Sequence, residues 1–133
     1  MVHITKEQIL KINNKCSNGW KFNVESFCFH NEKSFIKQIK LDDEHYLEFT
    51  LRYNSENQIL LHISKFYQEK GKEYATTNGI GKSKLLSNEI FKRKSIHYLI
   101  NFTKSLNDSQ LLEINKTTKP STGYGVILPS EDF

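Results

Sequence analysis

Hydrophobic and polar residues alternate most regularly in the middle of the chain, from Tyr46 to Tyr53. Four apolar residues fall on one side of an extended chain and four mixed residues on the other, namely Leu47, Phe49, Leu51 and Tyr53 against Tyr46, Glu48, Thr50 and Arg52. This period of two predicts a strand that buries one face and leaves the other partly solvated. The mixed residues therefore predict an accessible sheet face.

Shorter period-two patterns flank this strand on both sides. Residues 34–41 and 59–66 alternate regularly, whereas 21–29 alternates with one slip in phase, which predicts a strand with a β-bulge. Polar turn residues separate the segments at 42–44 and at 54–57. Four strands joined by short polar turns predict an antiparallel meander.

Helix signals lie at the two ends of this sheet region. Thr5 and Gln8 have the spacing of a capping box, which predicts an N-terminal helix that ends near Gly19. Apolar residues in 87–106 fit a period of 3.6 after a Ser cap, and a second helix is predicted to begin at Asn107. We expect these two C-terminal helices to pack on one face of the sheet.

Length and composition place these elements in one α+β domain. The chain has 133 residues, of which 37% are hydrophobic and 26% charged, and this composition favours a folded core over disorder. We assign residues 1–119 to a single domain. Residues 120–133 are predicted to form an irregular C-terminal tail, in which 124–128 is a candidate added edge strand.

Several kinds of site and location are disfavoured by the same sequence. No apolar run is long enough for a membrane span or a signal peptide, which predicts a cytoplasmic protein without a membrane partner. Cys16 and Cys28 do not have the spacing of a disulfide framework or a metal knuckle, and the five histidines are dispersed. We therefore predict no metal site and no cofactor.

The basic residues are almost all lysines, since only Arg52 and Arg93 of the nineteen are arginines. AT-rich codons specify Lys, Asn and Ile, and all three are abundant, which favours a low-GC bacterium, phage or mobile element as the source. Scarcity of Arg also disfavours base-specific recognition of DNA, because Arg supplies the planar fork that reads guanine.

One short motif suggests catalysis. Gly79-Ile80-Gly81-Lys82-Ser83 resembles the end of a phosphate-binding loop, but Thr76 stands where that loop needs its first Gly. The loop should also join a parallel strand directly to a helix, whereas the sheet predicted here is antiparallel. We interpret the motif as a glycine loop and predict that the protein is not an enzyme. A small hydrolase or a carboxylate nuclease remains the competing hypothesis.

Positive charge is concentrated in one stretch of the chain. Residues 65–94 carry eight basic and three acidic side chains, while the remaining residues carry eleven basic and twelve acidic ones. The candidate binding residues are the basic and tyrosine side chains of this stretch, together with one arginine on the open strand face: Lys65, Tyr67, Lys70, Lys72, Tyr74, Lys82, Lys84, Lys92, Arg93, Lys94 and Arg52. A loop that only keeps the protein soluble is the competing interpretation.

Two functional hypotheses follow. The first is a small non-catalytic binding protein, an accessory or inhibitory protein of a phage or mobile element. It would dock on a larger protein partner, with nucleic-acid enzymes among the candidates, through the basic loop and the open sheet face. The alternative is a Lys-rich nucleic-acid-binding domain with little sequence preference, in which Tyr67 and Tyr74 stack on bases.

Overall fold

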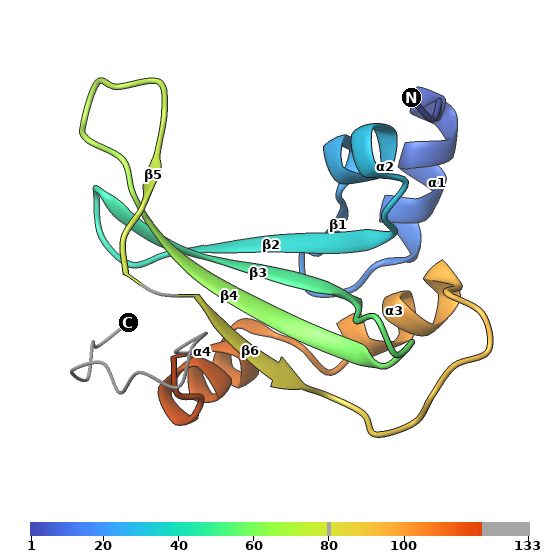
Figure 1. Cartoon of the computed structure of the whole chain (residues 1–133). Helices are drawn as coiled ribbons and strands as arrows, with labels where there is room; N and C mark the ends of the chain where they lie inside the picture. The colour runs from blue at the N-terminus through green and yellow to red at the C-terminus, as the bar shows by residue number, and fades with distance from the viewer. Residues whose placement is uncertain (80, 121–133) are drawn as a thin grey trace.

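The computed structural model describes residues 1–79 and 81–120, in which four helices accompany one antiparallel sheet (Figure 1). The helices are α1 (Lys6–Lys15), α2 (Val24–His30), α3 (Ile96–Thr103) and α4 (Asp108–Thr117). The strands are β1 (Lys21–Phe22), β2 (Ser34–Lys40), β3 (His45–Tyr53), β4 (Ile59–Tyr67), β5 (Thr76–Thr77) and β6 (Lys82–Leu85). The α+β class predicted from the sequence is confirmed.

The sheet is a meander that is extended at one edge. Its strand order is β1-β2-β3-β4-β5. Strand β6 also pairs with β4, at residues 60–63, whereas β5 pairs with Phe66 and Tyr67. The register places Phe35 opposite Leu51, and Leu51 opposite Leu61, so that one apolar row crosses the three long strands. All three side chains are fully buried. The meander predicted from alternation is therefore confirmed, with two short strands added to it.

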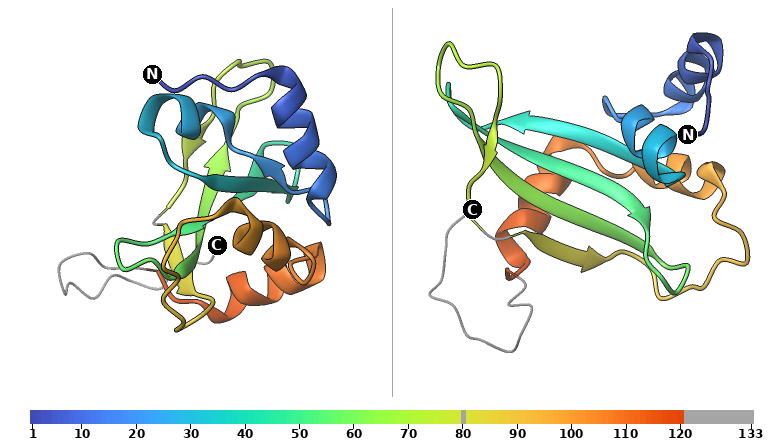
Figure 2. Two further views of the ribbon diagram at one scale, coloured as in Figure 1. Left: turned by 90° about the vertical axis from the view of Figure 1, so that its right-hand side faces the viewer. Right: turned by 45° about the horizontal axis from the view of Figure 1, so that its top comes forward.

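Helices α3 and α4 cover the buried face of the sheet (Figure 2). Leu99 and Leu111 bring these helices into the same core as the strand residues. The Trp20 indole Nε1 donates to the Leu106 carbonyl oxygen at 2.9 Å, and Lys37 of β2 forms an ion pair with Asp108 at 2.6 Å. Apolar burial and these polar contacts together fix the two helices on that face.

Helix α1 begins as its sequence predicts. The Thr5 side chain accepts from the Gln8 backbone N–H, and the Gln8 side chain accepts from the Thr5 backbone N–H, which completes the capping box. The helix ends at Lys15, a few residues before the predicted stop. Asn18 and Gly19 both have positive φ angles and turn the chain into the sheet.

The first predicted strand is wrong beyond its second residue, because residues 24–30 form α2. The Asn23 side chain accepts from the Ser26 backbone N–H at 3.2 Å and caps this helix. Phe27 then packs on Phe22 with ring centroids 5.4 Å apart, and Asn31 ends the helix in the left-handed conformation. The slip in phase that suggested a bulge is therefore the change from strand to helix.

The segment between the sheet and α3 also differs from its prediction. The long loop expected at 68–84 includes β5 and part of β6. The helix expected from Ser87 begins only at Ile96, with Ser95 as its cap. The intervening chain is held to the sheet, since the Leu86 N–H donates to the Ile59 carbonyl oxygen at 2.9 Å. The Phe91 N–H likewise donates to the Asn57 carbonyl oxygen at 3.0 Å, and these tertiary contacts override helix propensity here.

The predicted tail lies almost entirely outside the described residues, and so does its candidate edge strand at 124–128. Pro120 is described, and its backbone forms an isolated antiparallel bridge with Lys82. In the described part of the chain, no helix has the length and apolar character needed to span a membrane.

Candidate binding surface

The face of the sheet opposite α3 and α4 carries no helix over β3 and β4 (Figure 2, right). We call it the open face. Its central side chains are all partly exposed: Ile36, Thr50, Leu60, Tyr46, Phe66, Glu48, Ser64, His62 and Arg52. The Tyr46 and Phe66 rings stack with centroids 5.2 Å apart and an interplanar angle of 12°. The predicted division of β3 into buried and accessible sides is confirmed.

His62 lies near the middle of the open face. Its Nδ1 is 3.1 Å from the Ser83 hydroxyl and its Nε2 is 3.1 Å from the Ser64 hydroxyl. A Cβ on Gly81 would stand 2.8 Å from the ring, so the missing side chain gives the imidazole room. Burial lowers the pKa of His62, and the positive charge of Arg52 lowers it further. Sequence patterns did not predict this cluster, because β6 reaches His62 only through long-range strand pairing.

A pH-dependent loss of stability is expected from His62. Because its pKa is below the ordinary value of 6.5 in the folded protein, the unfolded chain takes up the proton first as the pH falls. Stability should therefore decrease from about pH 6.5 downward, through the lowered pKa of the folded state. Urea unfolding of wild type and His62→Gln across this range measures the effect. The exposed His97, as His97→Gln, is the matched control, and equal pH profiles for all three proteins would contradict the expectation.

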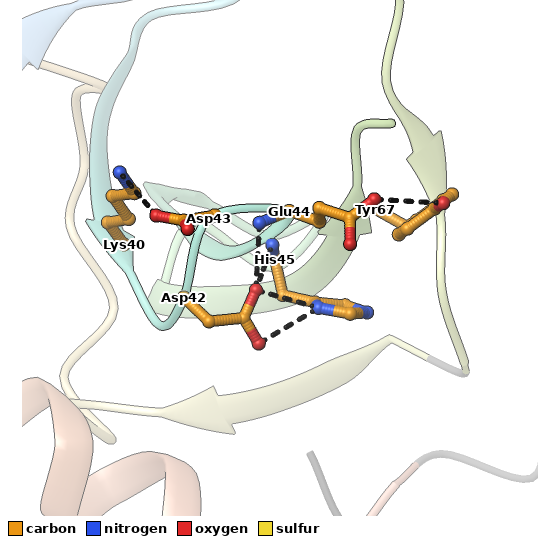
Figure 3. A network of polar contacts seen from close by, with 6 residues as sticks. All are labelled: Lys40, Asp42, Asp43, Glu44, His45 and Tyr67. Carbon is orange, nitrogen blue, oxygen red and sulfur yellow. Dashed lines mark hydrogen bonds and ion pairs between the residues drawn. The ribbon is translucent and has the colours of Figure 1, made fainter. Parts of the chain in front are cut away.

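The turn between β2 and β3 forms a polar network at one end of the open face (Figure 3). The Asp42 carboxylate accepts from the backbone N–H groups of Glu44 and His45, each at 2.8 Å, and pairs with the His45 ring at 2.9 Å. These bonds, the one from Glu44 first, hold the pKa of Asp42 below its usual value. The Tyr67 hydroxyl donates to Glu44 at 3.2 Å. The acidic residues at 42–44 therefore stabilise the turn between β2 and β3, as predicted.

This turn also changes the charge around the lysines that follow β4. A groove of about 700 Å³ lies between the turn and the connection at 68–72. Three basic and four acidic residues line it, namely Lys40, Lys70 and Lys72 against Asp42, Asp43, Glu44 and Glu69. Acids distant in sequence thus offset the positive charge at this end.

The structure separates the predicted basic stretch into two ends of the sheet. The connection between β4 and β5, which carries Lys70, Lys72 and the exposed Tyr74, extends from one end (Figure 1). The connection between β6 and α3 carries the exposed residues 92–94 at the other end. Lys65 and Tyr67 are partly buried on β4, and Lys84 is exposed on β6. The candidate binding residues of the stretch 65–94 therefore do not form one patch.

Lys82 is structural rather than part of an accessible surface. Its side chain is 4% exposed, and its Nζ donates to the Asn115 carbonyl oxygen at 2.8 Å, which ties β6 to α4. Lys82 and Ser83 lie within a strand paired antiparallel to β4, and they do not begin a helix. The Gly-Lys-Ser motif therefore lacks the strand-to-helix arrangement of a phosphate-binding loop.

Positive charge is concentrated at the end of the sheet where β2 begins. Two adjoining grooves of about 410 and 490 Å³ share Lys33 and Lys94 in their walls. Arg93 adds a third cation to the smaller groove, and Arg52 adds one to the larger. Arg52 pairs with Glu32 at 3.5 Å, the one acidic residue in either lining. Sequence reasoning missed Lys33, which lies far from residues 92–94 in the chain.

These observations define an α+β protein whose antiparallel sheet has one open face and one basic end. No family model, curated protein or solved structure matches the chain. Within residues 1–79 and 81–120, no group of three or more His, Cys, Asp or Glu side chains is arranged to hold a metal ion.

Proposed function

We propose that this protein is a small non-catalytic binding protein that docks on a larger protein through its open face. The observation that carries the proposal is a stacked, partly exposed aromatic pair on a sheet face without a covering helix. Tyr46 and Phe66 stack at one end of this face, and Ile36 and Leu60 lie toward its other end, beyond the polar pair of Glu48 and Ser64. Aromatic residues of this kind are enriched in the cores of protein interfaces.

The polar side chains of the open face favour docking as well. The Gln38 amide donates to Glu48 at 3.0 Å, and His62 bonds to Ser64 and Ser83. Polar groups that are already paired keep part of their hydrogen bonding when a partner displaces water. The face therefore combines apolar contact area with a reduced cost of desolvation.

Charge at the basic end supplies a preference among partners. Cations at the edge of an interface speed association with a negatively charged surface and disfavour a positively charged one. A larger protein with an acidic docking surface is the partner we propose. Its identity as a nucleic-acid enzyme, and the origin of this chain in a phage or mobile element, are proposals that rest on composition.

Replacing one aromatic residue of the open face should weaken docking. A tagged protein is used to capture partners from a low-GC host lysate, and affinity for the captured protein is then measured by biolayer interferometry. We expect Tyr46→Lys to weaken binding by about tenfold or more, because loss of a central aromatic contact at an interface commonly costs at least 1–2 kcal/mol.

Tyr74→Lys is the matched control, since Tyr74 is 80% exposed and lies in the connection between β4 and β5 rather than on a strand of the open face. It should bind like the wild type. Far-UV circular dichroism checks that both variants are folded. Unchanged affinity in a folded Tyr46→Lys variant would show that the open face is not the docking site.

Nucleic-acid binding is the second candidate, favoured by the four cations of the two basic grooves. The case for nucleic-acid binding is weaker than the sequence alone indicated, because Lys82 is buried and acidic residues line the same groove as Lys70 and Lys72. Binding of single- and double-stranded oligonucleotides across a salt series tests it. Absence of binding at low salt would eliminate this candidate.

A further inference from the structure

The smaller basic groove has an apolar floor and a cationic rim. Side chains from α1, α2 and the segments beside them form the floor, namely Ile4, Ile12, Phe22 and Phe27, and Ile96 closes it at the start of α3. All of these except Phe22 are partly exposed, although they also pack against the main core. This groove is separate from the open face, because Phe22 lies on the buried side of the sheet.

Three cations stand at the rim of this groove. Lys33, Arg93 and Lys94 are exposed. None of them takes part in the ion pairs or hydrogen bonds found among residues 1–79 and 81–120. Charge complementarity therefore favours an anionic occupant, because exposed cations without partners gain ion pairs from it and lose none.

The shape of the groove decides between classes of anion. It is open to solvent rather than enclosed, whereas sites for small molecules enclose most of the surface of their ligand. An apolar floor contributes little to binding a phosphate backbone, which cations alone attract. An amphipathic helix places its apolar side chains in such a groove, and acidic residues along its flanks reach the rim. An acidic amphipathic helix of a protein therefore uses both the apolar floor and the cationic rim of the groove.

We propose that the groove between α1, α2 and α3 binds an acidic amphipathic helical segment of a protein partner. The apolar side of the segment packs on Ile4, Ile12 and Phe27. Its carboxylates pair with Lys33, Arg93 and Lys94. The apolar contacts of this groove lie apart from those of the open face, so Ile4→Ser tests one proposal and Tyr46→Lys tests the other.

A synthetic helical peptide tests the site on the whole protein. The probe is a fluorescein-labelled peptide with Leu at helical spacing and Glu on both flanks of the apolar stripe. A scrambled peptide of the same composition, vesicles of phosphatidylglycerol and an oligo-dT strand are the competing ligands. Fluorescence anisotropy measures the affinities, and amide chemical shifts in ¹⁵N spectra locate the binding site.

Charge reversal at the rim should weaken binding of the amphipathic peptide by about tenfold, because two attractive pairs become repulsive. The double variant Lys33→Glu with Lys94→Glu makes this change. Lys70→Glu with Lys72→Glu is the matched control at the other end of the sheet, and it should stay within about twofold of the wild type. Ile4→Ser, which alters the floor and leaves the charges in place, should also weaken binding.

The expected result is tighter binding of the amphipathic peptide than of its scrambled form, with shifts at Ile96 and Lys33 and none at Tyr46. The proposal is wrong if the wild type does not bind the amphipathic peptide at low salt, or if the scrambled peptide binds equally well. It is also wrong if the rim variant binds like the wild type, or if vesicles or oligo-dT displace the peptide at lower concentration. None of these failures bears on the open face, which Tyr46→Lys tests separately.

Discussion

Replacing Trp20 with alanine should lower the free energy of unfolding by about 3–5 kcal/mol, the range for removing a large aromatic side chain from a packed core. Trp20 is 1% exposed, and it joins the turn after α1 to the connection between α3 and α4. The substitution leaves a cavity and removes the indole donor from the Leu106 carbonyl oxygen. Both losses occur where the first and last helical parts of the chain meet the sheet.

Urea unfolding followed by far-UV circular dichroism measures this effect, since Trp20 is the single tryptophan and its fluorescence disappears with the substitution. Trp20→Phe separates the two contributions. It keeps an aromatic ring in the core but removes the hydrogen bond, and we expect it to cost about 1–3 kcal/mol. A loss below about 1 kcal/mol in Trp20→Ala would contradict the central role of this residue.

The features that could be predicted from the sequence depend on neighbours along the chain. Strand β3 alternates over its whole length because one of its faces is buried, and that pattern is present in the sequence itself. The capping box of α1 likewise needs only Thr5 and Gln8, three residues apart. Patterns of this kind can be recognised in the sequence because they depend on residues that are close along the chain.

Helix α2 could not be predicted in the same way, because its seven residues fit two patterns. Val24, Phe27 and Phe29 satisfy a strand with a slip, whereas Val24, Phe27 and Cys28 satisfy a short helix. Packing of Phe27 on Phe22 and the cap at Asn23 select the helix. The deciding contacts form only when the segment meets β1, so periodicity alone does not contain them.

The distribution of charge over the surface could not be predicted from the sequence for a related reason. Counting along the chain grouped Lys70 and Lys72 with residues 92–94, but the strands carry these groups to opposite ends of the sheet. Pairing of β2 with β3 places the acids of 42–44 beside the first group, and the start of β2 brings Lys33 beside Lys94. Coulomb interactions depend on distance in space, so each cluster has its charge set by tertiary structure.

Lys82 is the residue whose interpretation changes most. Position 82 lies opposite Ile63 in the pairing of β6 with β4, which directs its side chain to the buried side of the sheet. A buried ammonium group is stable only when hydrogen-bond acceptors surround it, and Asn115 provides its backbone oxygen at 2.8 Å and its amide oxygen at 3.3 Å. The basic residue of the Gly-Lys-Ser motif thus connects β6 to α4.

Lys82→Met should therefore lower the free energy of unfolding by about 1–3 kcal/mol, because the chain length is preserved while buried oxygens of Asn115 lose a charged donor. Lys84→Met is the matched control, since Lys84 is exposed two residues further along the same strand, and it should change stability by less than about 0.5 kcal/mol. Urea unfolding of both variants measures the difference. Equal stabilities of the two variants would contradict the structural role of Lys82.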